Sequence, residues 1–236
     1  GVMSTAVFLQ ARLDSTRLKN KALLPLAGMT VVEHCMLALQ EVSAGHHVLL
    51  TDERSEEQLS PLAQRCGFLV FVGHPDDVLD RFARAAEHFG AGRIVRATGD
   101  NPLVSADVAR ACLSLMESLH VDYAGLTGMP LGTGVEVVSS AALAQADSEA
   151  DDRYSREHVT PWLYRNPDRF RVLTRTCPGD WEHSARVTLD TAEDYRNLQR
   201  IYDQLYAGRP VGIGELVQLL RREGERSIAS APGPEP

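Results

Sequence analysis

The chain has 236 residues, 44% of them hydrophobic and 24% charged, which is typical of one or at most two globular domains. Its formal net charge of −8 argues against a general nucleic-acid binder, because such proteins need a basic face. Any site for an anion must therefore come from a local group of cations.

The spacing of the cysteines and the hydropathy of the chain indicate which cellular compartment to expect. The cysteines lie far apart in the chain and form no CxxC pair: Cys35, Cys66, Cys112 and Cys177. This spacing excludes the usual zinc motifs and predicts reduced thiols. No apolar run approaches the roughly 20 residues of a membrane span, and no secretory signal is recognisable. We therefore expect a cytoplasmic protein that binds neither membranes nor nucleic acids.

The first half of the chain alternates short apolar runs with amphipathic stretches. The apolar runs predict strands at residues 5–11, 46–51, 68–73 and 93–99. Apolar residues at helical spacing predict helices at residues 30–42, 55–67, 76–90 and 105–119. Strands alternating with helices of this length are typical of βαβ units, so we predict an α/β fold with a mostly parallel sheet.

The pattern changes from Asp122 onwards. The Gly-rich segment 123–134 is predicted to be irregular. Further strands and helices are predicted in this half, with strands at 135–139, 170–176 and 185–190 and helices at 140–150, 151–167 and 192–206. A last short helix begins at Gly212.

Three cations, Arg12, Arg17 and Lys21, lie in the loop after the first strand, with Ser15 and Thr16 among them. Ligands of open α/β sheets bind outside the carboxyl ends of the strands, so this loop lies where a ligand is expected. Guanidinium and ammonium groups bind phosphates, and hydroxyl groups add donors. Neither a GxGxxG nor a GxxxxGK[ST] motif is present. A solvated loop whose cations pair with nearby acids explains this segment equally well.

Two aspartates are predicted at the carboxyl ends of strands. Asp100 follows "RATG", and Asp190 ends "VTLD" and precedes a helix. Both positions also suit a helix cap or an Asx turn, although Thr191 followed by Asp194 is a better placed cap than Asp190. Mg²⁺ prefers one or two carboxylates together with phosphate oxygens and water. The two aspartates and the cationic loop together therefore indicate a site for a metal and a nucleotide.

Four segments in chain order, "QARLDSTRLKNK", "ATGDNPL", "REHVTPW" and "LDTAEDY", resemble the spore-coat polysaccharide cytidylyltransferases. That family is related to the 3-deoxy-manno-octulosonate and acylneuraminate cytidylyltransferases, and the resemblance spans roughly residues 7–206. It implies a Rossmann-related, GT-A-like three-layer α/β/α sandwich, the fold of the nucleotide-diphospho-sugar transferases. It also implies transfer of CMP from CTP to an acceptor, with Mg²⁺ as cofactor, release of pyrophosphate and a homodimer.

By position in these motifs, Arg12 and Lys21 match residues that hold the triphosphate, and Asp100 and Asp190 match the aspartates assigned to Mg²⁺. These four are the expected catalytic residues for an in-line attack on the α-phosphate. The expected nucleotide-binding residues are Gln10, Ala11, Arg12, Ser15, Arg17, Lys21, Arg81, Thr98 and Asp100. Where the family commonly has Pro-Gly before the lysine, this chain has Lys-Asn, and we expect a less rigid loop.

The acceptor is expected to meet the segment around "REHVTPW". Arg153, Arg156 and His158 cluster there and suit an anionic acceptor: a sugar acid, a phosphorylated compound or a phosphonate. Glu136 also matches a family position. The alternative is a solvated helix face on which Arg153 and Glu157 pair at i,i+4, with Glu136 as an ordinary surface or supporting residue.

We interpret residues 3–222 as one domain, with a nucleotide-binding half at 3–121 and an acceptor and dimerisation half at 122–222. Residues 223–236 are small, polar and Pro-rich, which predicts a disordered tail. The predicted function is a CTP-dependent cytidylyltransferase of polysaccharide or phosphonate biosynthesis. Two alternatives stay open: a nucleotide-binding relative without turnover, and a nucleotidyltransferase that uses another nucleoside triphosphate.

Overall fold

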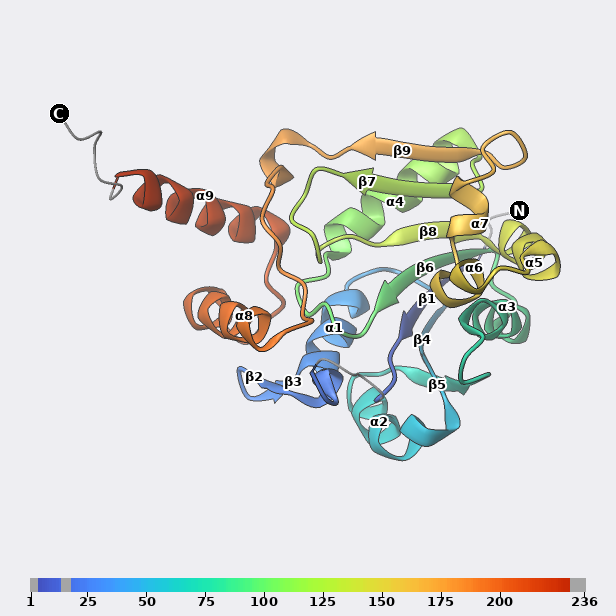
Figure 1. Ribbon diagram of the computed structural model, residues 1–236, viewed down its shortest axis with the longest axis horizontal. Helices are drawn as coiled ribbons and strands as arrows, with labels where there is room; N and C mark the ends of the chain where they lie inside the picture. Colours follow the sequence, from blue (N-terminus) through green and yellow to red (C-terminus); the bar gives the residue numbers. More distant parts are fainter. Residues whose placement is uncertain (1–3, 14–17, 230–236) are drawn as a thin grey trace.

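The computed structural model describes residues 4–13 and 18–229, which are built around a seven-stranded sheet (Figure 1). The sheet order is β5-β4-β1-β6-β8-β7-β9. The strands are β1 (Thr5–Gln10), β4 (His46–Thr51), β5 (Leu69–Val72), β6 (Arg93–Thr98), β7 (Tyr123–Thr127), β8 (Glu136–Ser139) and β9 (Val172–Thr176). Strand β8 runs antiparallel to β6 and β7, and the other neighbours pair in parallel. The predicted mostly parallel sheet is confirmed.

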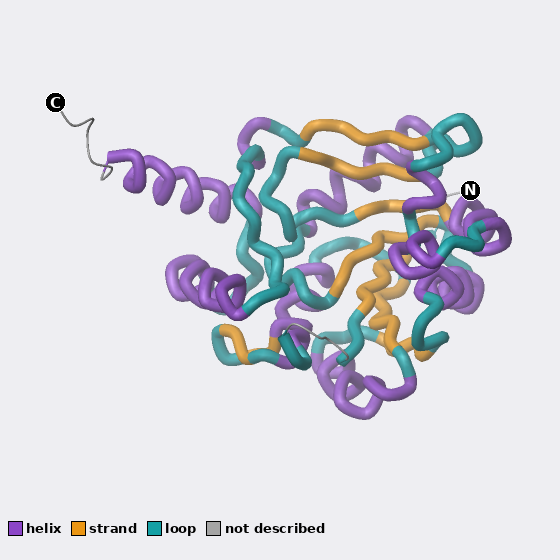
Figure 2. The backbone as a smooth tube through the Cα atoms, in the orientation of Figure 1, coloured by secondary structure: helices purple, strands orange, loops and turns teal. Residues whose placement is uncertain are grey.

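Helices cover both faces of the sheet, as the purple and orange segments of Figure 2 show. One face packs against α1 (Val31–Gln40), α2 (Glu53–Arg65), α4 (Ala106–Leu119), α8 (Ala192–Leu205) and α9 (Ile213–Ala229). The other face packs against α3 (Val78–Phe89), α5 (Ser140–Glu149) and the short α7 (Pro161–Tyr164). Because successive strand side chains point to opposite faces, Val7 and Leu9 of β1 join the first core and Ala6 and Phe8 the second. The fold is therefore the expected three-layer α/β/α sandwich.

Four small elements complete the described part of the fold outside these layers. The hairpin of β2 (Pro25–Leu26) and β3 (Met29–Thr30) follows a 3₁₀ turn at Lys21–Leu23. A second 3₁₀ turn lies at Gly179–Trp181, and α6 (Arg153–His158) precedes α7.

Side-chain caps fix where several helices begin. The predicted capping box of α1 is present: Thr30 Oγ1 accepts from the Glu33 backbone N–H at 3.3 Å, and Glu33 Oε1 accepts from the Thr30 N–H at 3.2 Å. Thr191 and Asp194 form the same arrangement at α8. The cap of α8 therefore does not need Asp190, as expected from the sequence.

Two predicted segments differ from the structure in the second half. Residues 123–127 were expected to be irregular but form β7, with Tyr123 and Ala124 buried between β8 and β9. Residues 185–190 were expected to form a strand but make one isolated bridge, between Leu131 and Arg186. The facing segment turns at Gly132, where φ is +108°, so the pairing cannot continue.

Two predicted helices also have different bounds. The segment 151–167 is two helices rather than one: it breaks at Val159, where φ is +72°, and Pro161 begins α7 because it lacks the N–H needed to continue α6. Helix α9 runs to Ala229, through Gly224, and so occupies part of the segment expected to be disordered. The Arg and Glu residues around that glycine are good helix formers and offset its roughly 1 kcal/mol penalty.

Two further features of the described chain concern its cysteines and the lengths of its helices. All four cysteines are free and buried. Within the described ranges, every helix is too short or too polar to span a bilayer.

Candidate active site

The loops that follow β1 and β6 lie side by side at the carboxyl edge of the sheet. The two strands pair in parallel with Gln10 opposite Thr98, and the Gly99 N–H donates to the Gln10 carbonyl at 2.7 Å. A Cβ at Gly99 would lie 2.7 Å from the Cβ of Ala11, so only glycine fits this close approach. Asp100 follows directly and is thereby placed at the edge, beside the loop after β1.

Lys21, Asp100 and Asp190 meet at this edge. The Nζ of Lys21 lies 2.8 Å from Oδ2 of Asp100 and 3.1 Å from Oδ1 of Asp190. These two carboxylate oxygens are therefore at most about 6 Å apart, the sum of the two distances. The side chains are between 20% and 30% exposed, so the group is accessible to a ligand. The structure thus brings together two aspartates from distant parts of the chain and the last lysine of the basic loop.

Lys21 reaches the aspartates from the 3₁₀ turn Lys21–Leu23. Asn20 precedes this turn in a left-handed conformation, with φ 51° and ψ 42°, which asparagine tolerates better than most residues. Burial alone would lower the pKa of Lys21, but the hydrogen bonds and charges of Asp100 and Asp190 together raise it. The ammonium group is therefore held in its charged form between two carboxylates.

Arg186 is a fourth member of this group, and the sequence analysis did not predict it. Its Nη2 lies 2.5 Å from Oδ2 of Asp190 and 3.3 Å from Oδ2 of Asp194. Burial would raise the pKa of Asp194, but hydrogen bonds from the N–H groups of Asp190 and Thr191 and the charge of Arg186 lower it. Arg186 stands four positions before Asp190, and the predicted strand there would have pointed both side chains to the same face. This spacing of four residues is the feature of the sequence that could have identified Arg186 as a neighbour of Asp190.

The two aspartates have the donor chemistry that a hard divalent cation requires. Within the described ranges, no group of three or more His, Cys, Asp or Glu side chains gathers as a closed metal cage. Two carboxylates fit Mg²⁺, which takes its other ligands from phosphate oxygens and water. Asp100 and Asp190 are therefore the residues that can hold such an ion, with Lys21 directly beside it.

Two other predicted residues after β1, Arg12 and Ala11, contact different parts of the described chain. Arg12 is exposed and its Nη1 donates to the carbonyl oxygen of Pro75 at 3.2 Å. Ala11 is buried, and its N–H donates to the Leu50 carbonyl. Ser15 and Arg17, both expected to bind the nucleotide, lie outside the described residues.

Two of the expected nucleotide-binding residues each have a side-chain atom that is buried without a hydrogen-bond partner in the described part of the chain. Arg81, in the first turn of α3, is fully buried, and its Nη1 is one of these atoms. The other is Oε1 of Gln10, the last residue of β1. Burial lowers the pKa of Arg81, and the charge of Asp52 opposes that effect. Because buried polar groups are nearly always paired, both atoms are candidates for contact with a ligand. The third predicted residue here, Thr98, accepts a hydrogen bond from Asn101 Nδ2 at 3.1 Å through its Oγ1.

Glu136 is held by three protein donors at the start of β8. Its carboxylate accepts from Nη1 of Arg96 at 2.9 Å, from the Tyr123 hydroxyl at 2.5 Å and from the Thr160 hydroxyl at 2.8 Å. Burial and the charge of Glu136 both raise the pKa of Tyr123. Glu136 therefore ties β6, β7 and the start of α7 together, which is the supporting role weighed as the alternative.

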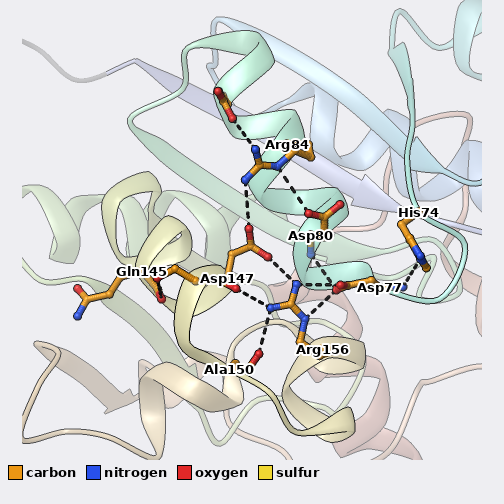
Figure 3. Close-up of polar contacts among 10 residues, drawn as sticks. His74, Asp77, Asp80, Arg84, Gln145, Asp147, Ala150 and Arg156 are labelled. Atoms are coloured by element: carbon orange, nitrogen blue, oxygen red, sulfur yellow. Dashed lines mark hydrogen bonds and ion pairs between the residues drawn. The ribbon is translucent and has the colours of Figure 1, made fainter.

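Arg156 was expected to bind the acceptor, and in the structure its guanidinium is bound within the chain (Figure 3). Its Nε and Nη2 donate to the two oxygens of Asp77, each at 2.9 Å, and Nη2 also donates to Oδ1 of Asp147 at 2.5 Å. Its Nη1 donates to the carbonyls of Asp147 at 2.7 Å and Ala150 at 3.2 Å. A guanidinium has five N–H groups, and these five contacts leave none for a ligand.

The remaining acceptor candidates are exposed. Arg153 and His158 lie at the two ends of α6, and the ring of His158 lies 4.4 Å from that of Tyr154. The ion pair of Arg153 with Glu157, which belonged to the alternative of a solvated helix face, is not formed among the contacts of the described chain. Both side chains are therefore accessible to an anion, unlike Arg156.

Comparison with known proteins gives independent evidence on the family of this chain. Residues 6–212 match the family model described as "Cytidylyltransferase". The spore coat polysaccharide biosynthesis protein SpsF of Bacillus subtilis strain 168 is 31% identical over 223 residues, 91% of this chain and 92% of that protein. The 3-deoxy-manno-octulosonate cytidylyltransferase of Aeromonas hydrophila is 28% identical over 185 residues, 75% of this chain and 71% of that protein. A solved cytidylyltransferase structure from Leptospira borgpetersenii has the same fold, with a TM-score of 0.87 at 24% identity, covering 99% of this chain and 100% of that one.

Proposed function

This chain belongs to the cytidylyltransferase family and is a nucleotidyltransferase, and we propose that it transfers CMP from CTP to a small anionic acceptor, releasing pyrophosphate. One observation carries the proposal: Lys21, Asp100 and Asp190 meet within hydrogen-bond distance at the carboxyl edge of the sheet. This edge is where open α/β sheets bind their ligands. A cation next to two accessible carboxylates suits a triphosphate and its metal ion.

The cations of the basic loop hold the triphosphate in this proposal. Lys21 donates to both aspartates, and the third of its three N–H donors can reach a phosphate oxygen bound at the same place. Arg12 makes a single 3.2 Å bond to the Pro75 carbonyl. A phosphate offers its guanidinium charge-assisted and bidentate bonds, which are about twice as strong as neutral ones.

Asp100 and Asp190 would hold Mg²⁺, which when bound would neutralise charge on the triphosphate. In nucleotidyl transfer an acceptor oxygen attacks the α-phosphorus, the bond from that phosphorus to the leaving pyrophosphate breaks, and negative charge builds on the pyrophosphate. Lys21 and Arg12 stabilise this charge as it develops. The protein otherwise contributes the alignment of nucleophile, phosphorus and leaving group.

The acceptor is an anion that meets the exposed side chains of Arg153 and His158 on α6. The relative from Aeromonas is named for 3-deoxy-manno-octulosonate, a sugar acid, and the relative from Bacillus for polysaccharide biosynthesis, which supports a sugar acid or a related anion. The nucleotide-binding half at 3–121 supplies Lys21 and Asp100, and the half at 122–222 supplies Asp190. The homodimer and the cytoplasmic location stay predictions.

The test is pyrophosphate release by the purified chain with Mg²⁺, each of the four nucleoside triphosphates and a panel of sugar acids, phosphorylated compounds and phosphonates. We expect release with CTP and one class of acceptor, and a loss of about 100-fold in Asp100→Ala, as for removal of one stabilising group from an active site. Release that survives Asp100→Ala undiminished would contradict the site. CTP binding without product from any acceptor would favour the alternative of a non-catalytic relative.

A further inference from the structure

Three arginines from three different elements converge on the loop between β5 and α3, residues 73–77. Two of them hold its middle. Arg12 donates to the carbonyl of Pro75 at 3.2 Å, and Arg81 donates to the carbonyl of His74 at 3.1 and 2.5 Å and to that of Pro75 at 3.0 Å. Both arginines are among the residues expected from the sequence to bind the nucleotide, and Arg12 holds the triphosphate in the function proposed above. The carbonyls of this loop therefore set the position of both guanidinium groups.

Arg156 holds the far end of the same loop. Its paired bonds to Asp77, each 2.9 Å, form a fork on the residue that also caps α3 by accepting from the Asp80 N–H at 3.1 Å. The opposite side of the guanidinium is fixed on α5 and the segment after it, through Asp147 and Ala150 (Figure 3). Burial would lower the pKa of Arg156, but these hydrogen bonds with Asp77 and Asp147 raise it. Arg156 therefore connects the acceptor half of the chain to the end of the loop.

The loop has little freedom between these two attachments. A Cβ on Gly73 would lie 2.5 Å from Cγ of Arg81, so the backbone lies directly on that side chain. The Nδ1 of His74 accepts from the N–H groups of Asp76 at 3.1 Å and Asp77 at 2.9 Å, which closes the loop on itself. A displacement of Asp77 is therefore transmitted to the carbonyls of His74 and Pro75.

We propose that Arg156 is a positioning residue for the nucleotide: it fixes Asp77 and, through the loop 73–77, holds Arg12 and Arg81 in place for CTP. The inference rests on the proposed function, because it takes CTP as the nucleotide. It differs from the role expected from the sequence, in which Arg156 would contact the acceptor. It also differs from a purely structural role, in which losing Arg156 lowers stability and leaves nucleotide affinity unchanged.

The variants are chosen to separate these roles. Arg156→Gln removes the fork and the charge, and Arg156→Lys keeps the charge but cannot form the paired bonds to Asp77. Arg84→Gln is the matched control, because Arg84 contacts the same Asp147 at 3.1 Å and does not contact the loop. Arg12→Ala measures the direct contribution of a cation that the loop holds.

The first measurement is CTP binding by calorimetry with the full chain and Mg²⁺, which needs no acceptor. We expect Arg156→Gln and Arg156→Lys to weaken CTP binding about tenfold, and Arg84→Gln to leave it within twofold. Arg12→Ala combined with Arg156→Gln should weaken binding by less than the product of the single effects, because part of the effect of Arg156 passes through the Arg12 guanidinium. The second measurement is hydrogen exchange of the 73–77 amides without nucleotide, which should speed up in the Arg156 variants and not in Arg84→Gln.

Several outcomes overturn the inference. One such outcome is that wild type and Arg156→Lys bind CTP equally tightly while Arg12→Ala binds it more weakly. This result overturns the inference and leaves the proposed function intact. Fully multiplicative effects of Arg12→Ala and Arg156→Gln, or unchanged exchange of the loop amides, overturn it as well. A wild-type chain that binds no CTP overturns the proposed function together with this inference. Where Arg156→Gln fails to fold, Arg156→Lys carries the same comparisons.

Discussion

Removing the charge of Lys21 tests how the aspartates of the site are held together. In Lys21→Met the carboxylates of Asp100 and Asp190 stay at this edge without the ammonium group between them. Their facing oxygens are at most about 6 Å apart, the sum of the two distances to Nζ. At that separation two unit charges repel by about 0.7 kcal/mol in water and about 3 kcal/mol at an effective dielectric constant near 20. Because the side chains are 28–30% exposed, we expect a loss of about 1–2 kcal/mol in the free energy of unfolding at pH 7.

The assay is urea unfolding followed by circular dichroism at several pH values, with Lys21→Met/Asp100→Asn as control. Removing one carboxylate together with the lysine relieves the repulsion, so the double variant should recover most of the lost stability. The pH dependence has a definite sign. The raised pKa of Lys21 gives wild type a contribution that is full below the usual lysine range, about 10.4, and disappears as the pH rises through the raised value. Lys21→Met should lack this alkaline loss.

Two results would refute this reasoning. Lys21→Met could unfold with the wild-type free energy at pH 7, within about 0.3 kcal/mol, which would mean that the carboxylates do not face each other. Alternatively, Asp100→Asn could destabilise the Lys21→Met chain further, which would mean that no repulsion was present to relieve.

Two more predictions concern the parts that place the site. Gly99→Ala should lower the free energy of unfolding by about 1–3 kcal/mol, because the new Cβ would lie 2.7 Å from the Cβ of Ala11. The control Gly179→Ala, whose Cβ would have no atom within 4 Å, should change the free energy of unfolding by less than about 0.5 kcal/mol. Equal effects of the two substitutions in thermal unfolding would contradict the close approach at Gly99. Glu136→Gln should lower the free energy of unfolding by about 2 kcal/mol, because Glu136 accepts from three donors. The control Glu87→Gln removes an exposed ion pair with Arg84 and should lower the free energy of unfolding by less than about 0.5 kcal/mol. A Glu136→Gln chain that matches wild type in urea unfolding would exclude the supporting role of Glu136.

The sequence predicted the parts of the fold that are governed by local periodicity. The strand at β1, the capping box at Thr30 and the cap at Thr191 follow from neighbouring residues, and all three are present. Segment 123–127 was assigned wrongly because its glycine hides the alternation, and its pairing partners β8 and β9 come later in the chain. The bridge at Arg186 shows the reverse: apolar alternation suggested a strand, but the facing segment turns at Gly132.

The candidate site, like the fold, could be predicted from the sequence only in part. Strand-end aspartates and a cationic loop could be recognised because parallel strands bring their carboxyl ends to one edge, and the structure does bring Lys21, Asp100 and Asp190 together. The role of Arg156 could not be predicted. Its partners Asp77 and Asp147 are brought to it by the packing of α3, α5 and α6, and nothing in "SREH" indicates that its donors are occupied.

The central claim is that Asp100, Asp190 and Lys21 form one site for a metal ion and a triphosphate. Diffraction from a crystal grown with CTP and Mn²⁺, recorded at the manganese absorption edge, tests it most directly. The claim predicts an anomalous peak within about 2.5 Å of carboxylate oxygens of both aspartates, with phosphate oxygens in hydrogen-bond distance of the Lys21 ammonium. A manganese peak that neither aspartate coordinates, with CTP bound elsewhere on the chain, would contradict it.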